Sequence, residues 1–190
     1  MSTLYTDNIR ANNASQITLP TGQKIVGTDA GSIVAPGGLL QVQQGFKSDA
    51  GTIQSSSFTN ISNLEVNITP HFATSKILVM YDLSMTIYNL TAQTRILRDS
   101  TAIAIGDAAG SRTRVNSSYL FPTSDANHSG PKHVGHFLDS PNTTNQITYR
   151  IQGKTQSNNV GYLNRTGNDA DNGDWSQRQA SSITVMEIAQ

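Results

Sequence analysis

Apolar and polar residues alternate along most of the chain after Leu39. Leu39–Gln44 alternates apolar residues with amides, and Lys76–Tyr88 is the strongest run, continuously apolar in its first half and alternating in its second. A continuous apolar run is typical of a central strand buried on both faces, and period-two alternation is typical of a strand with one buried face. The same pattern predicts further strands at Phe58–Ile68, Arg95–Gly106 (two strands with a turn near Asp99-Ser100), Val115–Phe121, His133–Leu138, Gln146–Gln152 and Ser182–Ile188.

These strands predict an all-β fold. No window of eleven or more residues has an amphipathic helical repeat with caps. Many short strands joined by polar turns indicate an antiparallel β-sandwich or jelly roll. Two longer polar stretches, Pro122–Lys132 and Ser157–Arg178, interrupt the pattern and are predicted to be loops.

The first 38 residues lack this pattern. They are punctuated by Pro and Gly, and their apolar residues are scattered, so the segment cannot bury enough apolar surface to offset its ordering entropy of about 1–2 kcal/mol per residue. We therefore expect an extended arm for attachment or trimerisation at residues 1–38 and a β-domain at residues 39–190. The arm's contacts are expected to use its apolar side chains: Ile9, Ile17, Leu19, Ile25, Val26 and Ile33.

The amino-acid composition excludes several classes of function. Ser, Thr, Asn and Gln make up 71 of the 190 residues, whereas Glu occurs twice. The net charge of zero provides no field that attracts a polyanion, so no nucleic-acid partner is expected. The absence of cysteine excludes disulfides and thiolate chemistry. The longest apolar stretch, Ile77–Tyr81, is far below the roughly 18 residues of a membrane span, and residues 1–5 do not resemble a secretion signal, so neither membrane insertion nor secretion is expected.

Several segments together resemble small virion appendage proteins, of the tail-fibre or head-decoration type, of marine and cyanobacterial bacteriophages. The N-terminal match is Ile17–Ile33 followed by Ala35-Pro36-Gly37. The β-domain matches in short blocks: Ile68-Thr69-Pro70, Ser75–Val79, Leu97–Thr101, Ile105-Gly106, Gly110–Arg112, Leu138–Pro141 and Ile183–Ala189. The stretches Pro122–Lys132 and Ser157–Arg178 have no counterpart in the pattern.

The resemblance implies a structural protein of the virion, assembled in the host cytoplasm. Proteins of this kind are usually homotrimers, and they carry no catalytic motif that could be transferred to this chain. The first hypothesis is a tail fibre or adhesin whose arm binds other virion proteins and whose loops contact a host surface glycan. The alternative is a capsid decoration protein, as a cement or head fibre. A third hypothesis, from another class, is a depolymerase that cleaves surface polysaccharide.

The most plausible glycan contact lies in the loop Ser157–Arg178. Aromatic faces beside amides and carboxylates suit polar, ring-shaped ligands, and the candidate residues are Tyr162, Asn164, Asp171 and Trp175. In the alternative interpretation, Trp175 packs over the end of the β-domain.

Two motifs raise the question of a metal site. His133 and His136 are three residues apart, a spacing that places them on opposite faces of a strand. The segment Asp169–Asp174 groups three carboxylates that could suit calcium, but it fails the EF-hand pattern, and the alternative is a solvated turn, which Asn-Gly-Asp favours on conformational grounds alone. No catalytic elbow, carboxylate pair or nucleotide-binding motif is present. We therefore expect no cofactor, no metal and no enzymatic activity.

Overall fold

The computed structural model describes residues 18–27, 32–122 and 130–190. The chain divides into two compact units, Met1–Ile33 and Val34–Gln190. In the first unit, the described residues contain neither helix nor strand. They form one turn, in which the Gln23 amide donates to the Pro20 carbonyl (3.0 Å) and Gly22 has the positive φ (84°) that such a turn requires.

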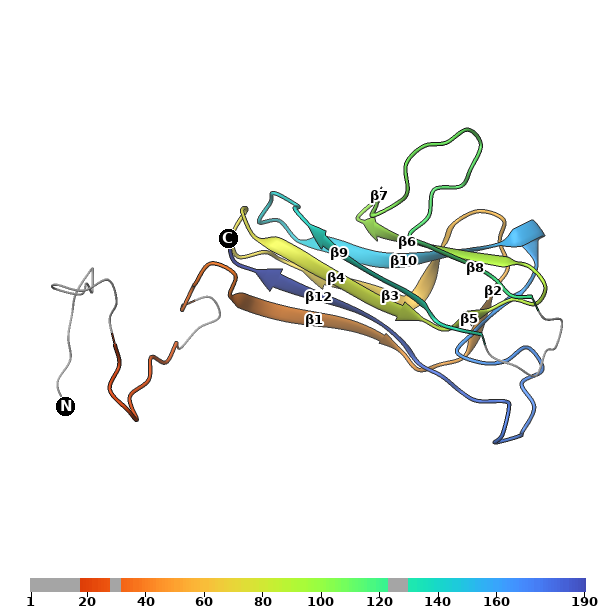
Figure 1. Ribbon diagram of the computed structural model, residues 1–190, viewed down its shortest axis with the longest axis horizontal. Coiled ribbons are helices and arrows are strands. Elements are labelled where there is room, and N and C mark those ends of the chain that lie inside the picture. Colours follow the sequence, from red (N-terminus) through yellow and green to blue (C-terminus); the bar gives the residue numbers. More distant parts are fainter. Residues whose placement is uncertain (1–17, 28–31, 123–129) are drawn as a thin grey trace. The chain divides into compact units, whose positions relative to one another are not determined.

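The second unit is built almost entirely from strands (Figure 1). One short 3-10 helix, η1, spans Gln156–Asn158. The strands of the described residues are β1 Leu39–Lys47, β2 Gly51–Ile53, β3 Thr59–Ile68, β4 Lys76–Leu83, β5 Met85–Thr86, β6 Thr91–Arg98, β7 Thr101–Ile103, β8 Ser117–Leu120, β9 His133–Asp139, β10 Ile147–Thr155, β11 Gly161–Leu163 and β12 Ser181–Ile188.

The strand order is that of a jelly roll. One sheet runs β1-β12-β4-β9, and the other runs β3-β10-β6. The first half of β6 also pairs with β8, and its second half pairs with β7. All pairings are antiparallel, and Figure 1 shows β12 lying between β1 and β4. The eight principal strands in chain order are β1, β3, β4, β6, β7 together with β8, β9, β10 and β12. Numbered from 1 to 8 in this order, the sheets read 1-8-3-6 and 2-7-4-5, which is the double Greek key of a jelly roll. The predicted all-β, antiparallel fold is confirmed.

The core lies between the two sheets, and strict alternation supplies it. In β10, Ile147, Tyr149 and Ile151 are buried while the residues between them are half-exposed. In β4, Ile77 and Val79 are fully buried, but Leu78 and Met80 on the other face are only half-buried. The prediction that this part of β4 is buried on both faces is therefore wrong for a single chain, because no second layer formed by the described residues covers the outer face.

Two very short strands were not predicted. β2 and β11 have three residues each and join β5 in a small third sheet. The stretch predicted as the loop Ser157–Arg178 therefore contains part of η1 and all of β11. Three residues cannot display a period, so the alternating pattern gives no signal for such strands. The predicted turn at Asp99-Ser100 is present, with Asp99 at φ 52°.

The folded β-domain begins a few residues before the predicted boundary. The Gly37 amide donates to the Ala189 carbonyl (2.8 Å), and the Ala189 amide donates to the Gly38 carbonyl (2.9 Å). These bonds extend the β1-β12 pairing, so that the unit starts at Val34 rather than Leu39.

The jelly roll has two chemically distinct ends. The end at which the chain enters, called here the arm-proximal end, holds the start of β1 and the end of β12, joined by the pairing of Leu39 with Ile188. The opposite, arm-distal end holds the pairing of Lys47 with Ser181, together with the small sheet and the loops around it.

Candidate functional site

Tyr162 lies at the arm-distal end, in the central strand of the small sheet. It pairs with Thr52 of β2 and Thr86 of β5. Its ring centroid is 5.7 Å from that of Tyr88, and the Arg165 guanidinium carbon lies 5.0 Å from the centre of its ring. The expected aromatic site residue is therefore part of a small aromatic and cationic group.

This group borders a shallow hollow of about 200 Å³. Tyr88 is held in place because its hydroxyl accepts a hydrogen bond from the Gly167 amide (2.6 Å). The lining residues are Ile87, Tyr88, Leu90, Asn159, Val160 and Tyr162. Two aromatic rings beside an amide side chain can stack on the apolar face of a sugar while the amide binds a hydroxyl. Tyr88 and Arg165 were not anticipated, because only the fold brings Tyr88, which lies two residues after β5, next to β11.

Asn164 is not part of a ligand surface, and this expectation is corrected. Its side chain is fully buried, and its amide nitrogen donates to the carbonyls of Lys47 (2.9 Å) and Asp49 (3.1 Å). Its amide oxygen accepts from the Ser181 hydroxyl (2.6 Å). All of the amide's strong hydrogen-bonding positions serve to join the end of β1 to the start of β12.

Asp171 and Trp175 lie on a separate part of the arm-distal end. Asp171 is exposed and Trp175 is half-buried in the loop between β11 and β12. Asp171 lines a second hollow of about 400 Å³, formed by Asp169, Ala170, Asp171, Asn172, Gly173, Ser176 and Arg178. The expected glycan residues thus border two different hollows.

The first carboxylate of the acidic segment Asp169–Asp174 is paired with arginines of the same loop. Arg178 donates to Asp169 (2.9 and 3.0 Å), and the Arg165 guanidinium lies 3.7 Å from the same carboxylate. The Asp174 amide donates to the Asn172 side-chain oxygen (2.9 Å), which is the turn geometry that Asn favours. In the part of the chain that the structure describes, no three His, Asp or Glu side chains come together as metal ligands.

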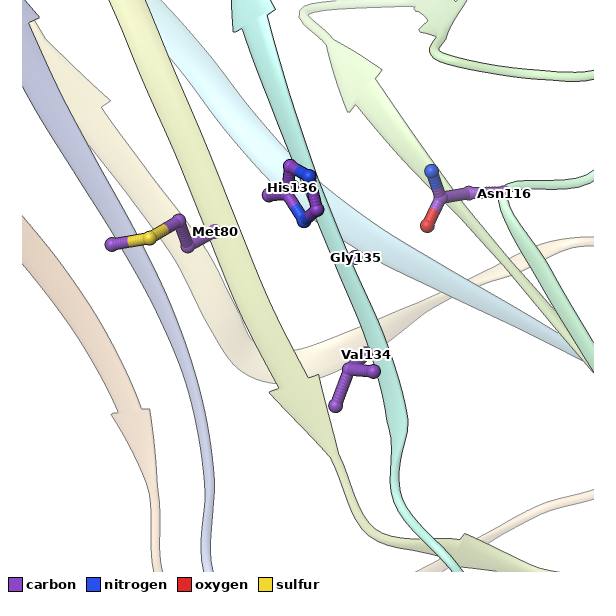
Figure 2. A pocket seen from close by; sticks show the side chains of 5 residues that line it. All are labelled: Met80, Asn116, Val134, Gly135 and His136. Carbon is purple, nitrogen blue, oxygen red and sulfur yellow. The ribbon is translucent and has the colours of Figure 1, made fainter.

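The two histidines of β9 point to opposite faces, as their spacing predicted. His133 is buried, with Nδ1 3.3 Å from the Ser117 hydroxyl, and burial lowers its pKa to about 4. His136 is exposed on the outer face of the sheet. There it borders a pocket of about 430 Å³, which Figure 2 shows together with the other lining residues, Met80, Asn116, Val134 and Gly135.

Glycine is required beside this pocket. A Cβ at position 135 would collide with the Asn116 side-chain oxygen and with the ring of Tyr81. The Tyr81 hydroxyl in turn donates to that Asn116 oxygen (2.8 Å). Gly135 thus allows the segment before β8 to approach β9, and this approach forms one wall of the pocket.

The arm-proximal end carries two buried carboxylates. Glu187 is fully buried, and although burial raises its pKa, hydrogen bonds from Gln41 (2.6 Å) and His71 (2.7 and 2.8 Å) hold that pKa below its ordinary value. Asp139 is also buried and binds Arg98 and Tyr149. This end is therefore rigidly connected.

The described apolar residues of the arm are exposed. Leu19, Ile25, Val26 and Ile33 have exposed fractions of 44 to 68%. The other two expected arm contacts, Ile9 and Ile17, lie outside the described residues.

Comparisons with known proteins include a distant structural likeness to a viral protein. Within the described residues, no helix is long and apolar enough to cross a bilayer. No family model and no curated protein matches the chain. Among solved structures, the chain is similar to the infectious bursal disease virus VP2 subviral particle, at a TM-score of 0.41 and 11% identity. The match covers 87% of this chain and 46% of the VP2 chain, so this protein spans less than half the length of that neighbour.

Proposed function

We propose that the chain is a structural protein of a bacteriophage particle: a homotrimeric tail fibre or adhesin. Its N-terminal arm attaches to other virion proteins, and its arm-distal loops contact the host surface. The protein works by attachment and assembly rather than by catalysis.

The separation of the two ends of the jelly roll carries this proposal. The blocks that resemble phage appendage proteins include Ile68-Thr69-Pro70 at the end of β3, Leu97–Thr101 at the end of β6 and Leu138–Pro141 at the end of β9. These segments meet at the arm-proximal end. The stretches without a counterpart, Pro122–Lys132 and Ser157–Arg178, connect strands at the arm-distal end. An attachment protein requires such a division, with a common base and a tip specific to its target.

The chemistry of the arm-distal end supports a polar ligand. Tyr88 and Tyr162 offer aromatic rings, Arg165 brings a positive charge to the Tyr162 ring, and Asn159 adds an amide. The rings and the amide suit the apolar face and the hydroxyls of a surface glycan. The hollow is shallow, so single-site affinity is weak, and three copies would bind through avidity.

Locating the protein in a reconstruction of the phage particle tests the proposal. Density at the tail supports the fibre. Density on the icosahedral lattice would replace it with the capsid-decoration alternative, and absence from the particle would overturn both. Incubation with host polysaccharide, followed by an assay for new reducing ends, tests the depolymerase; release of reducing ends would overturn the non-catalytic role.

A further inference from the structure

The two sheets of the jelly roll have different outer faces. The outer face of β3-β10-β6 is polar, and its residues include Glu65, Asn67, Gln93, Arg95, Thr148, Arg150, Gln152 and Lys154. The outer face of β1-β12-β4-β9 is mostly apolar, although Gln44, Ser182, Thr184 and His136 also lie on it. We define this apolar face by nine residues: Leu39, Val42, Phe46, Leu78, Met80, Val134, Leu138, Met186 and Ile188. Because both faces belong to one domain, overall composition does not explain the difference.

The pairing register aligns these residues into a continuous surface. Val42 lies opposite Met186, Met186 opposite Leu78, and Leu78 opposite Leu138. This row crosses all four strands. The side chains at its two ends, Val42 and Leu138, are 46 and 52% exposed, so nothing in the described chain covers the row.

The charged groups of the apolar face lie at its margins. Asp82, at its arm-distal margin, pairs with Lys132 (2.5 Å), and Lys76, at its arm-proximal margin, keeps its positive charge and donates to the Ser140 hydroxyl (2.7 Å). The centre of the face can therefore pack against neighbouring copies of this chain with little like-charge repulsion. A partner of strong net charge would find no complementary groups on it.

Its size points to a second copy with an arm. Four strands about 4.8 Å apart and seven residues long, at about 3.4 Å per residue, cover roughly 19 by 24 Å, or about 450 Å². A stable contact buries about 800 Å² per partner, so the sheet supplies more than half. Each further copy also brings an arm whose Leu19, Ile25 and Val26 are exposed, which provides apolar area for the remainder.

We infer that the apolar face is the subunit interface, and that each copy buries it against its two neighbouring copies around a threefold axis. The inference rests on the proposed function, because the homotrimer is part of that proposal. It adds the surface through which the trimer forms. It also explains why Leu78 and Met80, on the outer face of β4, are apolar, since the assembly supplies the missing layer.

Sedimentation equilibrium of the full chain at micromolar concentration tests the inference. The variant carries Val42→Lys and Leu138→Lys, two exposed positions at the ends of the row. The control carries Asn67→Lys and Thr148→Lys, which add the same charge to the polar face. We expect a trimer for the wild type and the control, and at least 100-fold weaker association for the variant.

Circular dichroism distinguishes loss of association from loss of the fold. If the variant is unfolded, Val42→Ser and Leu138→Ser replace the lysines, with the same expected direction. A variant that stays folded and trimeric would overturn the inference, as would a monomeric wild type, including one that binds lipid vesicles or another virion protein instead. A monomer located at the phage tail would overturn the interface and leave the attachment role standing, whereas a trimer absent from particles would do the reverse.

Discussion

Arg98 Nη1 donates to both carboxylate oxygens of Asp139, each at 2.9 Å, and so connects β6 of one sheet to β9 of the other. The Tyr149 hydroxyl donates to the same carboxylate (2.7 Å). Burial, followed by the hydrogen bond to Asp139, raises the pKa of Tyr149, so its phenol remains protonated and donating at any physiological pH. The carboxylate, which belongs to one sheet, is therefore held by two strands of the other sheet.

Asp139→Asn is expected to lower the free energy of unfolding by about 2–4 kcal/mol, because it leaves Arg98 without its counter-charge next to a buried phenol. Urea unfolding followed by circular dichroism measures the change. Asp107→Asn, at an exposed loop position, is the control and should change stability by less than about 0.5 kcal/mol. Equal stability of the two variants would contradict the role assigned to Asp139.

Asn164→Ala is expected to cost about 2–4 kcal/mol of stability. It removes three hydrogen bonds and leaves the buried carbonyl of Lys47 and the hydroxyl of Ser181 without this partner. Asn164 also has a left-handed backbone (φ 56°), which Ala adopts at a cost.

Asn158→Ala separates the two effects. Asn158 has the same left-handed backbone (φ 57°) but is exposed. It should lose only the conformational part, about 1 kcal/mol. Thermal unfolding of both variants measures the difference. If Asn164→Ala is no worse than Asn158→Ala, then the side-chain hydrogen bonds of Asn164 do not hold the loops.

The fold was predictable where a strand is long enough to alternate. β10 and β12 each place every second residue in the core, and this period is visible in the sequence. β11 was not predictable, because its three residues show no period. The pattern also could not distinguish one covered face from two in β4: the outer apolar residues were interpreted as a second buried face, which a single chain does not provide.

The candidate site was predictable only in part, because its contacts are distant in sequence. Tyr162 stood out as an aromatic residue in a polar stretch, but its neighbour Tyr88 is 74 residues away. Asn164 looked like its exposed amide neighbours. Its burial depends on Lys47, 117 residues away, and no local pattern reports that contact.

Stability is expected to fall as the pH decreases from about 6.5 to about 4, because of His133. Burial lowers the pKa of His133 to about 4 in the folded state, whereas the unfolded chain binds a proton near pH 6.5. Between these pH values the unfolded state holds one more proton than the folded state. The contribution of His133 to the free energy of unfolding is therefore complete above about pH 6.5 and decreases as the pH falls, by about 3 kcal/mol in total.

The pH dependence of unfolding in His133→Phe tests this expectation. The variant keeps an aromatic ring in the core and should lose most of the slope between pH 6.5 and 4. His136→Gln, at an exposed position of the same strand, should keep the wild-type slope. Glu187 does not produce the same slope, because its pKa is lowered in the folded state. The stability that Glu187 contributes is lost only below about pH 4.5. An unchanged slope in His133→Phe would assign the acid sensitivity to another group.

Two truncations that differ by five residues are expected to differ in stability. A chain starting at Val34 keeps the hydrogen bonds that Gly37 and Gly38 exchange with Ala189, whereas a chain starting at Leu39 loses both. We expect both to retain the circular dichroism of a β-protein, with the Leu39 chain about 1–3 kcal/mol less stable. Thermal unfolding at a concentration where both are monomeric removes the contribution of assembly. Equal stability would place the start of the domain at Leu39, and loss of structure in the Val34 chain would mean that the β-domain needs its arm to fold.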